Sequence, residues 1–328
     1  MKNIAVVTGG FSGEDVISRQ SAQMVMNNID REIYHPYLID ISKNGWFYIG
    51  DPDSYRDEKN ITVDKNDFSI LLNDQKINFD AVLMALHGDP GENGVLQSYF
   101  DLVGIPYTTG APFSMTMTFN KYATIQMLKA GNLPVADSVL LRKGQKVDKH
   151  FILKRVGLPC FVKPNFGGSS LGISKVLKAF ELSTAIETAF KESDEVIVEA
   201  FMSGREFTCG VFQEGDKIRP VAVTEVVSKN DFFDYESKYN AGLVDEITPA
   251  PINPKLYKTC QDLAVDAFRV LDCKGIARVD FIHTETGFKI IEINTVPGMT
   301  ELSIYPQMAE VSGISKKEML SMLLSNIL

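Results

Sequence analysis

The segment that most constrains the fold is IARVDFIHTETGFKIIEIN, residues 276–294, which reads as two alternating strands joined by a short loop. Glu285-Thr286-Gly287 is a three-residue hairpin loop, with glycine at the position that needs a positive φ. We therefore place Thr284 opposite Phe288 and predict an antiparallel hairpin whose pairing continues outward from that pair.

This register gathers four polar side chains on one face of the hairpin, because successive side chains of a strand point to opposite faces. Asp280 lies across from Glu292, and Arg278 lies across from Asn294. The other face receives the apolar side chains Val279, Phe281, Ile291 and Ile293.

An ordinary half-solvated sheet shows the same alternation, so the four polar residues need a chemical interpretation. Two carboxylates and an amide oxygen form the all-oxygen ligand set that Mg²⁺ prefers, with positions left for phosphate oxygens and water. The adjacent Arg278 adds a forked donor suited to a phosphoryl oxygen. The pattern favours a site for a metal ion and phosphate.

A second segment, FVKPNFGGSSLGISKV, places Lys163 at the end of one strand and a Gly/Ser loop, residues 167–170, before the next. Glycines let backbone N–H groups approach a phosphate closely, although a plain flexible hairpin has the same composition. The loop lies between strands and lacks G-x-x-x-x-G-K-[ST], which argues against a P-loop. A nucleotide phosphate bound here would therefore be held by a different fold.

A third segment, LHGDPGENG, follows a predicted strand and places His87 in a glycine-rich loop at that strand's carboxyl end. Ligands of open α/β sheets bind at this end, although a lone histidine in a turn can also be structural. An oxidoreductase with a dinucleotide fold is disfavoured, because Thr8 stands where the first glycine of G-x-G-x-x-G belongs.

The chain alternates predicted strands and helices and divides into three units of mixed α/β and α+β class. Strands at 4–7, 34–41 and 79–86 and a helix at 94–103 indicate a parallel, doubly wound domain over 1–110. Its first helix is predicted to start with a capping box from Ser12 and Asp15. The remaining units are 111–201, with a predicted helix over 178–191, and 202–328, with a polar and aromatic segment at 228–246 that is predicted to be a lid.

The net charge of −9 argues against nucleic acid or a membrane surface as the main partner, since both favour basic faces. The four cysteines form no C-x-x-C pair, which fits buried, reduced thiols in a cytosol. No signal peptide and no membrane-spanning apolar run of roughly 18 residues is present in the sequence. We therefore expect a cytoplasmic protein.

Taken in order, these segments resemble the D-alanine:D-alanine ligases of the ATP-grasp superfamily, from GGFSGEDVIS to NTVPGMTELS. The strongest signatures are LHGDPGENG and ARVDFI…IIEINTVPGMT. The resemblance implies a three-domain ATP-grasp fold with ATP held between the central and C-terminal domains. It also implies two Mg²⁺ ions, with Mn²⁺ able to substitute, D-alanine as the other substrate, and a homodimer.

The resemblance also implies roles for residues of the nucleotide and metal sites. Lys121 and Lys163 match the lysines that contact phosphates, and Arg278 matches the residue that stabilises the acyl phosphate and the tetrahedral intermediate. Adenine and ribose are assigned to Glu199, Met202 and Glu206. The two-metal site is assigned to Asp280, Glu292 and Asn294.

For the amino acid substrates, Glu14 matches the carboxylate that holds the first ammonium group, linked through Ser169 to Tyr239. His87 lies in the loop beside that subsite, and Gly298 matches an oxyanion donor. The residues that match the second substrate's carboxylate site are Lys238 and Ser303. Tyr239 favours D-alanine there, because relatives that use D-lactate tend to carry phenylalanine or histidine.

The predicted activity is ATP-dependent ligation of two D-alanines through D-alanyl phosphate, for peptidoglycan precursor synthesis. The sequence departs from the family pattern at Ala200, Phe233 and Asn93. The first two bear on the nucleotide and lid contacts that the resemblance implies, not on the reaction. The alternatives are a D-alanine:D-lactate or D-serine ligase and another ATP-grasp carboxylate–amine ligase. A catalytically idle nucleotide-binding module is a further alternative, which the intact metal residues and Arg278 disfavour.

Overall fold

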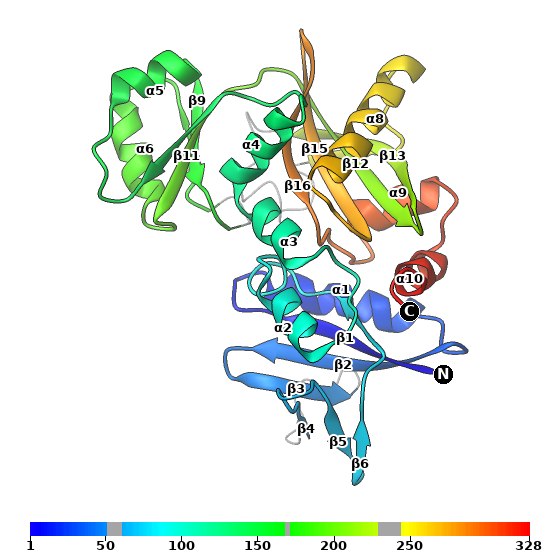
Figure 1. Cartoon of the computed structure of the whole chain (residues 1–328). Coiled ribbons are helices and arrows are strands. Elements are labelled where there is room, and N and C mark those ends of the chain that lie inside the picture. The colour runs from blue at the N-terminus through cyan, green and yellow to red at the C-terminus, as the bar shows by residue number, and fades with distance from the viewer. Residues whose placement is uncertain (51–60, 168–170, 229–243) are drawn as a thin grey trace.

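The computed structural model describes residues 1–50, 61–167, 171–228 and 244–328, which form three main sheets (Figure 1). The N-terminal sheet lies at one end, the C-terminal sheet at the other, and the central sheet projects to the side of the latter (Figure 1). Several predicted features lie outside the described residues: Ser169, Phe233, Lys238, Tyr239 and most of the 228–246 segment.

The N-terminal sheet has the strand order β4-β3-β2-β1-β7. The predicted strands form its parallel part: β1 (Lys2–Gly9), β2 (Tyr34–Ser42) and β7 (Ala81–Met84). The predicted wholly parallel domain is wrong at one edge, where β3 (Gly45–Gly50) and β4 (Ile61–Thr62) run antiparallel. Ser42 pairs with Gly45, and so tight a turn can only return the chain antiparallel.

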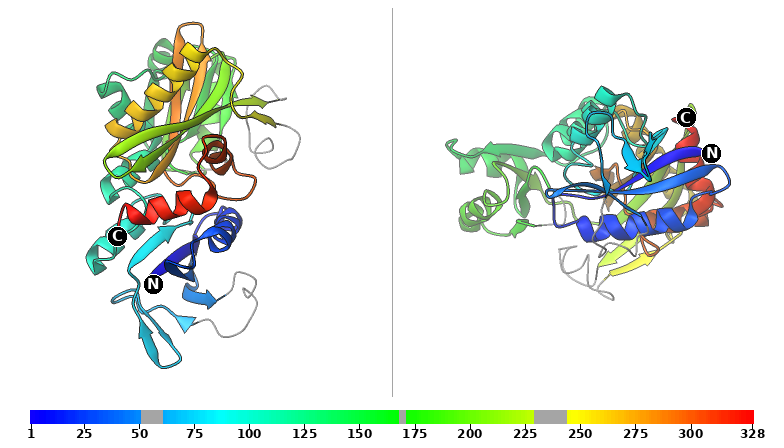
Figure 2. Two further views of the ribbon diagram at one scale, coloured as in Figure 1. Left: turned by 90° about the vertical axis from the view of Figure 1, so that its right-hand side faces the viewer. Right: turned by 90° about the horizontal axis from the view of Figure 1, so that it is seen from below.

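Helices cover both faces of this sheet, as predicted for a doubly wound domain (Figure 2). One face packs on α1 (Asp15–Asn28) and on α10 (Lys316–Ser325) from the far end of the chain. The other packs on α2 (Val95–Val103) and on the hairpin of β5 (Ile70–Leu72) and β6 (Gln75–Ile77). The predicted helix 94–103 is thereby confirmed, with Gly104 ending it in the left-handed region.

The predicted capping box at the start of α1 is wrong. Glu14 is the N-cap residue, and the Ser12 hydroxyl oxygen accepts only a 3.4 Å bond from the Glu14 N–H. The Glu14 side chain makes no capping hydrogen bond and lines a cavity instead.

The central sheet is antiparallel, with the strand order β10-β9-β11-β8. Its strands are β8 (Ser138–Arg142), β9 (Cys160–Pro164), β10 (Ser174–Val176) and β11 (Glu195–Ala200). Helices α5 (Lys149–Val156) and α6 (Leu182–Ala189) share its hydrophobic core. The predicted single helix over 178–191 is divided into a 3₁₀ turn, Ala179–Glu181, and the shorter α6.

Two helices, α3 (Pro112–Phe119) and α4 (Lys121–Ala130), connect the N-terminal sheet to the central one (Figure 1). The start of α4 is fastened by Asn165, which directly follows β9 and is fully buried. Its Oδ1 accepts from the Tyr122 N–H at 2.8 Å, and its amide group donates to Asn120 and Glu195. Lys121 is therefore held at the junction of β9 and α4.

The C-terminal sheet has the order β14-β13-β12-β15-β16. Its strands are β12 (Arg205–Glu214), β13 (Lys217–Ser228), β14 (Val244–Ile247), β15 (Ile276–Thr284) and β16 (Gly287–Asn294). One face packs on α8 (Pro254–Val270). Helix α9 (Ile304–Val311) packs against β12 and β13. Asn253 caps α8, its side chain accepting from the Leu256 N–H at 2.9 Å.

The β15–β16 hairpin confirms the two predicted polar pairs, Asp280 with Glu292 and Arg278 with Asn294. The predicted loop is wrong, because Thr284 pairs with Gly287 and only Glu285-Thr286 remains between the strands. A β-bulge beyond Asp280 adds one residue to β16 and restores the register.

The bulge corrects the prediction for Ile291, which was expected on the apolar face. Ile290 occupies the core, and Ile291 instead lines the cavities on the polar side of the hairpin. No helix among the described residues combines the length and the apolar character that crossing a lipid bilayer requires.

Candidate active site

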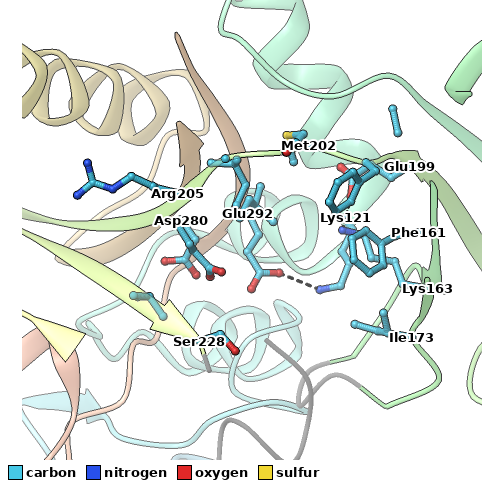
Figure 3. Close-up of a pocket in the computed structure, with 18 of the residues that line it drawn as sticks. Lys121, Phe161, Lys163, Ile173, Glu199, Met202, Arg205, Ser228, Asp280 and Glu292 are labelled. Carbon is cyan, nitrogen blue, oxygen red and sulfur yellow. Dashed lines mark hydrogen bonds and ion pairs between the residues drawn. The ribbon is translucent and has the colours of Figure 1, made fainter. Parts of the chain in front are cut away.

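A cavity of about 550 Å³ lies between the central and C-terminal sheets (Figure 3). Its volume is in the range of small-molecule sites. The central sheet contributes Lys163 and Glu199, and the chain just after β11 contributes Met202. The facing wall is the hairpin with Arg278, Asp280, Ile282, Ile291 and Glu292.

A second cavity of about 280 Å³ extends from the hairpin toward the N-terminal sheet. Glu14 and His87 line its N-terminal side, and Asn294 and Gly298 line its C-terminal side. Residues common to both cavities are Lys121, Gly167, Arg278, Ile291 and Glu292. The two cavities therefore meet at the polar face of the β15–β16 hairpin.

Arg278 and Asp280 form a bidentate pair at this junction. The Nε and Nη2 groups donate to Oδ1 and Oδ2 of Asp280, each at 3.0 Å. Burial opposes the guanidinium charge, but the carboxylates around it, Asp280 first, outweigh burial and raise the pKa of Arg278. Arg278 is a fixed positive charge at the meeting point of the two cavities.

Asn294 lies at the end of β16, with its side chain on the same face. Its Oδ1 atom is buried and has no hydrogen-bond partner among the described residues. A buried oxygen without a partner is costly, and this one lines the smaller cavity, where a ligand can satisfy it. The nearby Glu292 carboxylate contacts Lys121 Nζ at 3.4 Å, drawn as a dashed line in Figure 3.

The oxygens of this face provide the donor set for a hard cation. Asp280, Glu292 and Asn294 offer two carboxylates and one amide oxygen, as Mg²⁺ prefers. Within the described ranges, no cluster of three or more His, Cys, Asp or Glu side chains could hold a metal ion. The donor set on this face therefore includes the amide oxygen of Asn294 beside the two carboxylates.

Lys163 and Glu199 form a buried ion pair on the opposite wall, with 2.5 Å between Nζ and Oε2. Burial disfavours the ammonium charge, but Glu199 and then Glu292 outweigh burial and raise the pKa of Lys163. The other oxygen, Oε1 of Glu199, has no hydrogen-bond partner in the part of the chain that the structure describes. An N–H donor of a bound ligand can satisfy it.

Sequence reasoning missed an ion pair at the rim of the larger cavity. Arg205 Nε and Nη2 donate to the Glu225 carboxylate at 2.7 and 2.8 Å, and hydrogen bonding with Glu225 raises the pKa of Arg205. Both residues line the cavity together with the predicted Met202 and Glu206. No motif marks this pair, because its partners lie on separate strands.

Both ring nitrogens of His87 make hydrogen bonds. Nδ1 donates to the Val296 carbonyl oxygen at 2.9 Å, and Nε2 lies 2.8 Å from the Ser21 hydroxyl. Ser21 also accepts the Met299 N–H at 3.1 Å. Because a carbonyl oxygen only accepts, Nδ1 carries the hydrogen in this arrangement. His87 thus connects the N-terminal sheet to the turn that carries Gly298.

Two glycines permit close approaches around the smaller cavity. Gly88 has a positive φ of 71°, and a Cβ there would lie 2.6 Å from Glu14 Oε2. A Cβ at Gly298 would lie 2.8 Å from the Ser303 hydroxyl. Ser303 Oγ accepts the Thr300 N–H at 3.0 Å and lies beside the cavity-lining Gly298.

The described residues thus bring together most of the predicted site. The residues predicted to bind the nucleotide line the larger cavity, and Glu14, His87 and Gly298 line the smaller one. Ser303 borders the smaller cavity, beside Gly298. Ser169, Lys238 and Tyr239 lie outside the described residues, and their roles stay predictions.

Comparison with known proteins agrees with this geometry. The family model described as the D-ala D-ala ligase N-terminus matches residues 3–110, and that of the C-terminus matches residues 127–325. This chain belongs to the D-alanine–D-alanine ligase family. The D-alanine–D-alanine ligase of Phocaeicola vulgatus is 43% identical over 327 residues, which cover 99% of both chains.

Solved structures of the ligase family share the fold. The VanG D-Ala:D-Ser ligase of Enterococcus faecalis matches with a TM-score of 0.89 at 32% identity, covering 100% of this chain and 99% of that one. The Bacillus anthracis D-alanine–D-alanine ligase complexed with ATP matches with a TM-score of 0.78 at 26% identity, covering 99% and 97%. The predicted ATP-grasp fold, with its mixed α/β and α+β units, is confirmed.

Proposed function

We propose that this chain joins two D-alanines at the expense of ATP, through a D-alanyl phosphate, to supply a peptidoglycan precursor. The observation that carries this proposal is the meeting of two cavities at Arg278 and the oxygens of the hairpin face. A nucleotide cavity and an amino acid cavity that join at one charged face suit transfer of a phosphoryl group between their occupants.

The larger cavity is the proposed ATP site. Glu199 Oε1 is a buried acceptor for the amino group of adenine, and Met202 and Glu206 line the same region. Lys121 and Lys163 place two positive charges between this region and the hairpin. They would neutralise charge on the triphosphate, as phosphoryl transfer requires.

The hairpin face fits Mg²⁺, and we assign two ions to it, with Mn²⁺ able to replace them. Asp280, Glu292 and Asn294 would hold them, because the unpartnered Asn294 Oδ1 completes an all-oxygen donor set. Bound Mg²⁺ supplies charge neutralisation on the transferred phosphoryl group. The contact between Lys121 and Glu292 would then lengthen, so that Lys121 could bind the phosphates.

The first step joins the carboxylate of one D-alanine to the γ-phosphorus of ATP. The bond from that phosphorus to the β,γ-bridging oxygen breaks, and ADP leaves with the electron pair. Arg278 faces both cavities and would bind the oxygens of the acyl phosphate. Glu14, lining the smaller cavity, would hold the ammonium group of this first substrate.

The second step joins the deprotonated amine of another D-alanine to the acyl carbon. Negative charge develops on the carbonyl oxygen, where Arg278 and the Gly298 N–H would stabilise it. The bond from the acyl carbon to the phosphate oxygen then breaks, inorganic phosphate leaves with the electron pair, and the nitrogen gives up its extra proton to the departing phosphate. Ser303, beside Gly298, is the proposed partner of the second carboxylate, together with Lys238. For Ser169 and Tyr239 we keep the predicted role, a link that runs from Glu14 through Ser169 to Tyr239.

A phosphate-release assay tests this function. ATP and Mg²⁺ are mixed with D-alanine, D-lactate, D-serine or L-alanine, singly and in pairs, and products are identified by mass. We expect turnover with D-alanine alone and the D-alanyl-D-alanine mass. An enzyme that turns over only when a second, different acceptor is added would contradict the proposal.

D-serine as the second substrate is the alternative that has a specific observation in its favour. The VanG D-Ala:D-Ser ligase aligns over this whole chain with a TM-score of 0.89. Competition between equal concentrations of D-alanine and D-serine, with both dipeptides quantified, separates the two functions. We expect D-alanyl-D-alanine to dominate.

We further propose a cytoplasmic location, a homodimer, and domain boundaries near residues 110 and 201. The four cysteines support the location, because all are free and buried. Burial raises the pKa of Cys160 to about 11, so this thiol is chemically quiet. Sedimentation of the purified protein tests the dimer, and limited proteolysis tests the boundaries.

A further inference from the structure

Thr208 lies on β12, directly opposite Asp280 in the sheet, and no sequence motif marks it. Its side chain is buried, with 2% of the residue exposed. The hydroxyl lies 2.5 Å from Asp280 Oδ1 and 3.3 Å from the Val279 carbonyl oxygen. The shorter distance and the negative charge make the carboxylate its acceptor.

The donors around Asp280 leave its two oxygens unequal. Oδ1 accepts from the Thr208 hydroxyl and from Arg278 Nε, whereas Oδ2 accepts from Arg278 Nη2. A carboxylate has about two lone-pair sites on each oxygen. Counting the donors that the described residues provide, Oδ1 is saturated and Oδ2 keeps one site.

We propose that Thr208 is a positioning residue that makes Asp280 a one-oxygen metal ligand. Its hydroxyl occupies Oδ1 and so presents Oδ2 to the cation, while Arg278 holds the plane of the carboxylate. Mg²⁺ demands near-ideal octahedral geometry, so a rotated or two-oxygen carboxylate would bind it less well. This inference rests on the proposed function, because the metal site belongs to it.

The sheet offers a matched control for Thr208. Thr224 on β13 pairs directly with Thr208 and is equally buried, at 0% exposed. Its hydroxyl bonds to the Thr248 hydroxyl at 2.6 Å. Threonine-to-valine replacement keeps the side-chain shape at both positions and removes one buried hydroxyl from each. Only Thr208→Val removes a donor to Asp280.

The test is Mn²⁺ binding, read from the electron paramagnetic resonance signal of the free ion, with saturating non-hydrolysable ATP analogue. Outer-shell partners typically contribute 10- to 100-fold in metal affinity, so we expect Thr208→Val to weaken Mn²⁺ binding about tenfold. Thr208→Ser, which keeps the hydroxyl, and Thr224→Val should bind Mn²⁺ like the unchanged protein. Binding of the analogue in EDTA should be equal in all four proteins.

Unchanged Mn²⁺ affinity in Thr208→Val would overturn the inference, as would an equal loss in Thr224→Val. If thermal melting shows that Thr208→Val is unfolded, Thr208→Ala is judged by the same criteria. Analogue binding without any Mn²⁺ binding in the unchanged protein would instead refute the proposed metal site. The two failures are therefore distinguishable.

Discussion

His87 Nδ1 lies 2.9 Å from the carbonyl oxygen of Val296, so the loop after β7 is bonded directly to the turn after β16. Ser21 closes the same connection from α1, contacting His87 Nε2 and accepting the Met299 N–H. Gly298 lies inside this bonded turn. The position of the proposed oxyanion donor is therefore set by the loop after β7 and by α1.

Ser21→Ala should lower kcat more than it raises the KM for ATP. It leaves His87 Nε2 and the Met299 N–H unpaired, and each buried orphan costs about 1 to 3 kcal/mol of stability. Ser114→Ala is the matched control, because Ser114 is equally buried and donates to Leu271 away from both cavities. Steady-state kinetics and denaturant unfolding of both variants measure this. Equal loss of kcat in the two would show that the connection acts only through stability.

Gly88→Ala should raise the KM for D-alanine, because the new Cβ would lie 2.6 Å from both Glu14 Oε2 and Ser12 Oγ and would push the Glu14 carboxylate out of place. Gly104→Ala is the control: its φ of 72° nearly equals the 71° of Gly88, but a Cβ there meets nothing within 4 Å. Backbone strain of about 1 kcal/mol should therefore destabilise both variants similarly. Only Gly88→Ala should change the D-alanine dependence of ADP formation. The same KM in both variants would argue against Glu14 as a substrate ligand.

Glu199→Gln should destabilise the protein by about 3 to 5 kcal/mol, as is typical when one partner of a buried ion pair is removed. The pKa of Lys163 is raised in the folded state, so its stabilising contribution is complete below the unfolded lysine pKa of about 10.4. That contribution is lost as the pH rises through the higher folded-state pKa. The stability difference from the unchanged protein should be largest at neutral pH.

Urea unfolding between pH 7 and pH 11 measures this difference. Asp194→Asn is the control, because it breaks the exposed pair of Asp194 with Lys143 and should change stability little. If the stability difference between Glu199→Gln and the unchanged protein instead grows toward pH 11, the folded state lowers the pKa of Lys163.

Arg278→Lys should reduce kcat by about 10²- to 10³-fold, the usual effect of removing a donor from a developing oxyanion. Lysine keeps the charge but loses the two-pronged geometry that fits Asp280 and an acyl phosphate. Arg269→Lys is the control, because Arg269 pairs with Asp266 at the surface. Coupled assay of ADP formation measures both. Full turnover in Arg278→Lys would refute its assignment.

The hairpin face was predictable because alternation is a local property of the sequence. Arg278 and Asp280 share one face of β15 and Glu292 and Asn294 share one face of β16 because side chains alternate, but the register decides whether the two pairs lie opposite each other. The register held only because the bulge at Ile291 offset a loop one residue shorter than predicted. The adjacent Ile290 and Ile291 break the alternation, which is a signal for the bulge.

The supporting residues were not predictable in the same way. Thr208, Asn165 and Arg205 act through partners on other strands or helices, and no local pattern records such contacts. The antiparallel edge of the N-terminal sheet was missed because its strands are short and half-buried, which weakens their periodicity. Contacts between segments that are far apart in the sequence determine these supporting residues and this sheet edge.

The packing of α10 against α1 has a consequence for synthesis of the protein. Met319, Leu320, Leu323 and Leu324 complete the hydrophobic core beneath the first sheet. While the chain is still on the ribosome, the apolar surface that α10 covers must stay exposed until nearly all of the remaining residues have emerged. We expect nascent chains stopped before residue 316 to bind chaperones and to be degraded by proteases.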